Sequence, residues 1–166
     1  GPGGDRSLQR GTDLLISSDR PRTRITLENT PVVFAGYGVD APEKGWDDFK
    51  TLDVRGKILL VLVNDPDWQA DGLEGPFGGK AMTYYGRWTY KYEEAARQGA
   101  AAAIIVHQSE PASYGWNVVQ SSWTGPQWQM EGAEVGASQA IGWLQLDATK
   151  KLFASAGQDF EALSAA

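Results

Sequence analysis

Continuous apolar runs along the chain predict the central strands of a buried sheet. Two such runs occupy residues 57–63 (KILLVLV) and 101–106 (AAAIIV), and a third candidate strand covers residues 140–146. A strand that is exposed on one face alternates polar and apolar side chains, whereas a strand covered on both faces is apolar throughout. The first two runs are therefore expected to lie inside the protein.

The segment between these two runs predicts an α-helix over residues 88–98. Gly99 follows at the position where a left-handed residue ends many helices. Because a helix that links two such strands makes them parallel, the three segments predict a βαβ unit with a right-handed crossover. Large and small apolar residues recur at i, i+4, i+7 and i+8, which is one face of a helix: Trp88, Tyr92, Ala95 and Ala96.

Shorter elements are expected on either side of this unit. Residues 23–27 alternate in polarity and predict a half-buried strand, and residues 32–37 predict another. Residues 46–49 are expected to form one helical turn.

Two helices are expected near the end of the sequence. The first is capped by Asp147 and ended by Gly157, and the second is short and carries Phe160 and Leu163.

The pattern also predicts the domain organisation. Residues 1–29 are mostly polar and are expected to be an arm or linker, in which residues 1–4 resemble the remnant of a cleaved tag. Residues 30–166 are expected to form one domain. Within it, residues 64–81 and 108–138 lack regular patterning, and long loops of this kind are often functional.

Composition narrows the function classes. The net charge of −6 without a basic stripe disfavours nucleic-acid binding. Apolar runs stay shorter than the roughly 18 residues of a membrane helix, and the polar first ten residues do not resemble a secretory signal. The sequence has no cysteine, which excludes disulfides and cysteine–zinc sites. We expect neither a nucleic-acid nor a membrane partner.

Candidate catalytic and metal-binding residues are few. His107 is the only histidine, so this chain cannot form a zinc site that relies on histidine unless carboxylates and water supply the other ligands. Asp65, Asp67 and Asp71 invite a calcium interpretation, but the spacing of an EF-hand is missing. Aspartates that cap turns of their own loop explain them better, and a weak, irregular calcium site stays open. We expect no catalytic residue, no metal site and no cofactor in this chain.

Aromatic residues supply the candidate binding site. Trp88 and Tyr92, on the predicted helix, are expected to pack on the sheet. Aromatic residues and an arginine in loops are typical of contacts with a ligand or partner. The candidate substrate- or partner-binding residues lie before the helix and in the long loop after residue 108: Tyr84, Tyr85, Arg87, Trp116, Trp123 and Trp128.

Several segments together resemble a known family. They are VVFAGYGVDAPEKGWDDF, DVRGKILLVLVNDPDW, GKAMTYYGRWTYKYEEAARQGAAAAIIVH, VVQSSWTGPQ and LQLDATKKLFASAGQDFEAL. In this order they resemble the protease-associated domain that is inserted in bacterial di-zinc aminopeptidases of the glutamate carboxypeptidase-like superfamily. The resemblance covers roughly residues 30–164.

This resemblance implies a fold and a role. The fold is α/β, a swivelling β/β/α domain with a curved or barrel-like mixed sheet and a few flanking helices. The implied role is a non-catalytic lid over the catalytic cleft that assists substrate access or binding, with the peptidase domain of the same polypeptide and a peptide or protein substrate as partners. Zinc is expected only in that peptidase domain, and a periplasmic or secreted location is implied. The isolated domain is expected to be a monomer.

Two other functions stay open. The chain could be a free-standing module that binds a peptide or protein, which a gene without a peptidase domain would favour. It could also be a phosphohistidine swivelling domain with His107 as phosphate carrier. A position at the end of a strand fits that role poorly, because phosphate is better held at a helix N-terminus.

Overall fold

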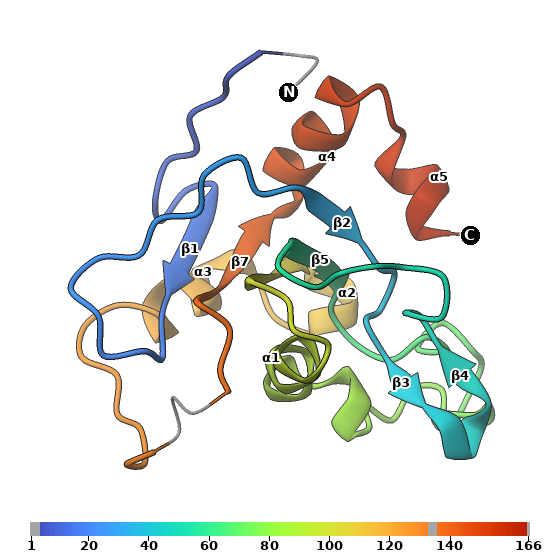
Figure 1. Ribbon diagram of the computed structural model, residues 1–166. Helices are drawn as coiled ribbons and strands as arrows, with labels where there is room; N and C mark the ends of the chain where they lie inside the picture. The colour runs from blue at the N-terminus through green and yellow to red at the C-terminus, as the bar shows by residue number, and fades with distance from the viewer. Residues whose placement is uncertain (1–3, 133–135, 166) are drawn as a thin grey trace.

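A mixed five-stranded sheet with helices on both faces organises the protein (Figure 1). The computed structural model describes residues 4–132 and 136–165. The strand order is β1-β7-β6-β5-β2, in which β1 is antiparallel to β7 and the other neighbours are parallel. These strands are β1 (Leu14–Ser17), β2 (Val32–Phe34), β5 (Ile58–Leu62), β6 (Ala102–His107) and β7 (Ala140–Gln145).

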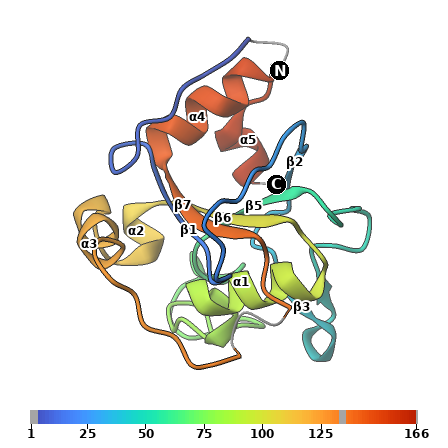
Figure 2. The ribbon, with the colours of Figure 1, turned by 60° about the vertical axis from the view of Figure 1, so that its left-hand side comes forward.

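The helices lie in two groups (Figure 2). Helices α4 (Leu146–Ser155) and α5 (Phe160–Ser164) cover one face of the sheet, and α1 (Trp88–Arg97) covers the other. Two short helices, α2 (Ser109–Ala112) and α3 (Trp116–Ser122), follow β6, and α3 lies on the side of α1. Every helix among the described residues is too short or too polar to cross a bilayer.

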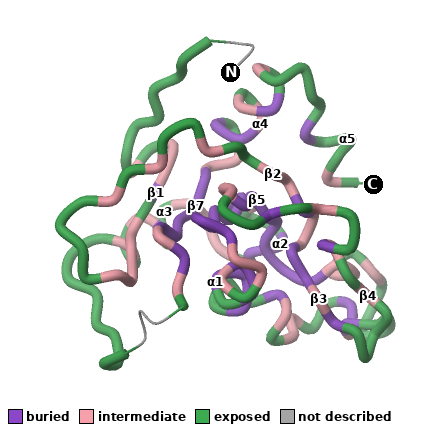
Figure 3. The backbone as a smooth tube through the Cα atoms, in the orientation of Figure 1, coloured by how far each residue is buried: buried purple, intermediate pink, exposed green. Residues whose placement is uncertain are grey.

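The central strands are apolar throughout because each face packs on a different helix layer. Leu60, Ile104 and Leu144 pack towards α4 and α5, whereas Leu59 and Ile105 pack towards α1. Every residue of β6 is buried, and Figure 3 shows burial concentrated in the central strands and α1. The prediction of strands covered on both faces is confirmed for β5 and β6.

The helix predicted over residues 88–98 is confirmed as α1, and Gly99 follows it with a φ of +77°. Strands β5 and β6 are parallel neighbours, and α1 lies in the connection between them. On α1 the residue that meets the sheet is Ala95, which is fully buried, whereas Ala96 is only half-buried.

Two predictions of local structure are wrong. Residues 23–27 form no strand, because Ile25 and Leu27 stay half-exposed and no strand among the described residues pairs with them. Residues 46–49 do not form a helical turn. Trp46–Asp47 is strand β4, which pairs with β3 (Asp40–Ala41) across the short 3-10 helix η1 (Pro42–Lys44).

The edge next to β7 is occupied instead by β1, from within the predicted arm. Leu15 pairs with Trp143, and Ile16 pairs with Gly142. A Cβ atom on Gly142 would lie 2.3 Å from the carbonyl oxygen of Leu15. Glycine at this position therefore permits β1 to approach.

The predicted ends of the last helices need one correction. Asp147 does not cap α4, because the Gln145 side chain accepts hydrogen bonds from the amides of Asp147 and Ala148. Gly157 follows α4 with a φ of +73°, and Asp159 caps α5. The stretch predicted as irregular, residues 108–138, also contains α2 and α3.

We expect Ala95→Leu to destabilise the protein by about 1–3 kcal/mol, because the fully buried methyl group leaves no room for a larger side chain. Ala96→Leu is the matched control on the same helix, and its half-exposed position should tolerate the change within about 0.5 kcal/mol. Urea unfolding of both variants measures the difference. Equal destabilisation by the two changes would contradict the assignment of Ala95 as the contact with the sheet.

Candidate interaction site

The aromatic residues just before and within α1 form two groups that face different parts of the protein. Tyr84 and Tyr85 lie in the 3-10 helix η2 (Tyr84–Gly86) and contact Tyr90 of α1, with ring centroids 5.9 and 4.9 Å away. Trp88, at the first position of α1, instead contacts Trp123 at the end of α3, at 6.4 Å. We call Tyr84, Tyr85 and Tyr90 the tyrosine cluster.

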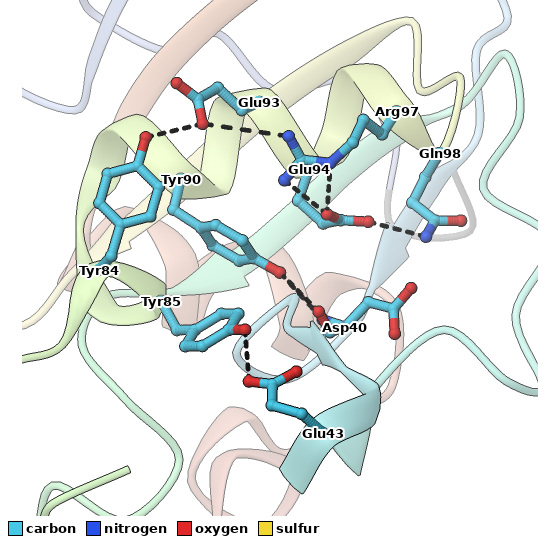
Figure 4. Close-up of polar contacts among 9 residues, drawn as sticks. All are labelled: Asp40, Glu43, Tyr84, Tyr85, Tyr90, Glu93, Glu94, Arg97 and Gln98. Carbon is cyan, nitrogen blue, oxygen red and sulfur yellow. Dashed lines mark hydrogen bonds and ion pairs between the residues drawn. The ribbon is translucent and has the colours of Figure 1, made fainter. Parts of the chain in front are cut away.

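The hydroxyl groups of the tyrosine cluster are held by acidic residues (Figure 4). Tyr84 donates a hydrogen bond to Glu93 at 2.7 Å, and Tyr85 donates one to Glu43 at 2.6 Å. These bonds raise the pKa of each tyrosine, and the bond from Tyr85 lowers the pKa of Glu43. Both hydroxyl groups therefore already have partners within the chain.

Tyr90 connects the cluster to the β3–β4 hairpin. Its hydroxyl exchanges hydrogen bonds with the backbone amide and carbonyl of Asp40, each at 3.1 Å. The guanidinium of Arg97 lies 5.5 Å from the centre of its ring and pairs with Glu94 at 2.7 Å (Figure 4). Burial raises the pKa of Tyr90 above its usual value. These contacts make the cluster a structural junction between α1 and the hairpin.

Two adjoining pockets lie beside Trp88, the aromatic residue of α1 that faces α3. Each has a volume of about 220 Å³, and both are lined by Trp88 and Tyr114. The first is also lined by Met82, Arg87 and Ala112. We call the two pockets together the aromatic groove.

The second pocket extends along α3. It is lined by Val118, Trp123 and the buried Trp143, besides the shared residues. Trp88 is 45% exposed and Val118 is 40% exposed. The groove thus presents large apolar side chains at the surface, which is typical of contact sites.

The rim of the groove is positive in an otherwise acidic protein. Arg87 is the only charged residue among the described residues that line the two pockets. No carboxylate of the described chain pairs with its guanidinium. Helix α1 begins beside Arg87, and no side chain of the described residues caps its first amides. Because Arg87 and Trp88 line the first pocket, the positive end of the helix dipole lies at the same rim.

A buried lysine holds α1 against the loops that form the groove. Lys91 is 1% exposed, and its ammonium donates to the carbonyl oxygens of Tyr37 at 2.7 Å and Asn64 at 3.0 Å. These carbonyls follow β2 and β5. Burial lowers the pKa of Lys91 to about 7, although the nearby carboxylates of Asp65 and Asp48 act in the opposite direction.

Asp65 extends this connection to the groove. Its carboxylate accepts hydrogen bonds from the backbone amide and hydroxyl of Thr83, at 2.6 and 2.9 Å. The backbone amide of Asn64 donates to the carbonyl of Gly86, a residue that lines the first pocket. A Cβ atom on Gly86 would lie 3.0 Å from the backbone of Asp65. The wall of the groove is therefore attached directly to the end of β5.

Hydrogen bonds within the chain account for two of the three aspartates that suggested a calcium site, Asp65 and Asp67. Asp65 binds Thr83, and Asp67 accepts from the amide of Phe77 at 2.8 Å. Across residues 4–132 and 136–165, no group of three or more histidine, cysteine, aspartate or glutamate side chains could hold a metal ion. The loop-capping interpretation explains both Asp65 and Asp67.

The predicted binding residues do not form one surface. Arg87 and Trp123 line the groove, whereas Tyr84 and Tyr85 belong to the tyrosine cluster. Trp116 is half-buried in the core and donates a hydrogen bond to the carbonyl of Gly11 at 3.0 Å.

Trp128 lies apart, in the segment after α3, and is 94% exposed. The prediction for Tyr92 is confirmed, since it is buried and donates to the carbonyl of Gly142 at 2.9 Å. The prediction that Trp88 is a core residue is wrong, because its ring lies between α1 and α3 rather than on the sheet. The pattern missed Met82, Tyr114 and Val118 as groove residues, since nothing in their spacing marks them.

His107 does not have the surroundings of a phosphate carrier. It is 2% exposed and lies among the rings of Tyr114, Trp116 and Trp143, at 5.7, 5.6 and 6.0 Å. Burial lowers its pKa. A residue that receives and passes on a phosphoryl group must be accessible, so this environment disfavours the phosphohistidine alternative.

Comparison with known protein families identifies the class of this fold and site. The family model described as the PA domain matches residues 28–139, about two thirds of the chain, and the protein therefore belongs to the PA domain family. Such protease-associated modules generally mediate substrate or protein interaction. No curated protein and no solved structure matches the chain. The matched region runs from β2 to α3 and leaves out β1, β7, α4 and α5.

The buried lysine makes stability depend on pH in a defined direction. Between pH 7 and pH 9 the unfolded chain keeps Lys91 protonated, while the folded protein releases this proton. The unfolded state then binds more protons, so stability rises with pH, by up to about 1.4 kcal/mol per pH unit from this group. We expect Lys91→Met to remove this rise in urea unfolding at pH 6, 7, 8 and 9.

Lys151→Met, at an exposed position of α4, is the control and should keep the wild-type slope. Equal slopes for Lys91→Met and the wild type would show that Lys91 is not the responsible group.

Proposed function

We propose that the protein is the non-catalytic PA domain of an exported zinc aminopeptidase and that it borders the catalytic cleft, where it assists substrate access or binding. The observation that carries this proposal is the aromatic groove, in which Trp88 and Val118 are exposed beside an unpaired Arg87 of the described chain. Aromatic residues and arginine are enriched at the centres of interfaces. A domain that only filled space would not require them at its surface.

The chemistry is assigned to another part of the same polypeptide. The single histidine is buried, and the sequence has no cysteine. Zinc would be held by the peptidase domain, and this chain would contribute contacts alone. Its partners are then the peptidase domain and a peptide or protein substrate, the setting is periplasmic or secreted, and the isolated domain is a monomer.

A free-standing module for peptides or proteins is the second candidate. The same groove favours it, because a groove with exposed aromatic walls suits either arrangement. The gene discriminates between the two: a di-zinc peptidase sequence on both sides of this segment supports the first, and an open reading frame without one supports the second.

We expect Trp88→Ala in the full-length polypeptide to lower kcat/KM for peptides by about tenfold, the size of a typical interface hot spot. Because Trp88 is nearly half-exposed, the isolated chain should lose less than about 2 kcal/mol of stability. Trp128→Ala removes an indole that is 94% exposed and is the matched control. Peptidase assays and thermal unfolding are compared for both variants; unchanged kinetics in Trp88→Ala would rule out a role of the groove in substrate access or binding.

The isolated chain should be chemically inert. Zinc analysis of the purified 166-residue protein is expected to find well below one equivalent, and aminoacyl-nitroanilides should not be cleaved. Stoichiometric zinc, or peptidase activity that survives rigorous purification, would refute the assignment of the chemistry to another domain.

A further inference from the structure

We infer that the aromatic groove binds the carboxyl-terminal residue of a peptide, with the α-carboxylate at Arg87 and a large apolar side chain in the second pocket, against Trp123 and Val118. This inference rests on the proposed function and names the part of the substrate that the domain recognises. Three properties of the groove carry it: the size of its pockets, its charge and the short distance between its two halves.

The pockets have the size of side chains rather than of cofactors. Each measures about 220 Å³, below the roughly 300–1,000 Å³ of sites that enclose a whole small molecule. The second pocket is lined almost entirely by carbon-rich side chains, of which Trp88, Trp123 and Trp143 are the largest. A bulky apolar side chain gains most from burial there.

The charge of the groove selects an anion. Arg87 is its one charged residue within the described chain, and the start of α1 adds positive potential beside it. Acidic side chains surround the tyrosine cluster instead, where Glu43 and Glu93 accept from Tyr85 and Tyr84. A peptide with a negative end is therefore favoured at the groove and disfavoured at the tyrosine cluster.

Because the two pockets adjoin, the carboxylate and the apolar side chain that occupy them are expected to come from one peptide residue. They share Trp88 and Tyr114 as common walls, so the negative group and the apolar group must be close together. In the last residue of a peptide, the α-carboxylate and the side chain are attached to the same Cα atom. Such a residue can place one group on each side of Trp88, and a guanidinium binds carboxylate in a geometry that suits this end group.

In the proposed peptidase, the PA domain would bind one specific part of the substrate. An aminopeptidase acts at the amino end of its substrate, whereas the groove would hold the opposite end. Short peptides with a large apolar last residue would then be held at both ends, and longer chains would be held at one.

The test measures binding of N-acetyl-Ala-Ala-Phe to the 166-residue protein by titration calorimetry. The free acid is expected to bind about tenfold more tightly than the carboxyl amide, because only the acid offers a charge to Arg87. Arg87→Gln should abolish this difference, and Trp88→Ala should weaken the acid by about tenfold. Arg24→Gln, at an exposed arginine outside the groove, is the matched control and should behave as the wild type. Circular dichroism confirms that each variant is folded.

The opposite results overturn the inference. The first is equal affinity for the free acid and its carboxyl amide. The second is that N-acetyl-Ala-Asp-Phe-amide, whose charge lies on an internal side chain, binds as tightly as the free acid. The third is that none of the three peptides binds. The proposed function is judged separately, since the loss of kcat/KM on Trp88→Ala in the full-length polypeptide does not depend on which part of the substrate the groove contacts.

Discussion

The ammonium group of Lys91 is the contact on which the arrangement of the site depends. It lies in the interior and bonds to carbonyl oxygens that follow two different strands, at Tyr37 and Asn64. Removing a charge from water is costly, so this contact is retained only where the partners are well placed. It sets the position of α1 along the sheet, and through Asp65 and Thr83 it also sets the loop that leads into α1. The aromatic groove is built on this loop.

One helix consequently serves two surfaces with different properties. The face that carries Tyr90 is joined to the β3–β4 hairpin, and its hydrogen-bonding groups are occupied within the chain. The first turn, at Trp88, faces α3 and leaves apolar rings and Arg87 uncovered. A shift of α1 would disturb both surfaces together. This explains why residues close in sequence, such as Tyr85 and Arg87, have different surroundings.

Sequence patterning predicted the central elements because their signal is local. The apolar runs of β5 and β6, the periodicity of α1 and the glycines after α1 and α4 can each be recognised within a short stretch of sequence. Strand β1 escaped prediction because Leu14–Ile16 is short and its partner, β7, lies far away in sequence. Of the candidate binding residues chosen from the sequence, Arg87 and Trp123 line the groove. The exposure of Trp88 depends on where α3 lies, which no spacing encodes.

The pairing of β1 with β7 has a consequence for the order of folding. Ser18, just after β1, bonds to the carbonyl of Gln139, 121 residues away in sequence. Closing so long a loop has a high entropic cost, so contacts between β5, α1 and β6 are expected to form earlier. Of the five strands of the sheet, β1 is synthesised before the others, and its partner β7 is synthesised after the others. Until β7 is made, β1 has no partner strand within the sheet, and its unpaired backbone groups can pair with another copy of the nascent chain.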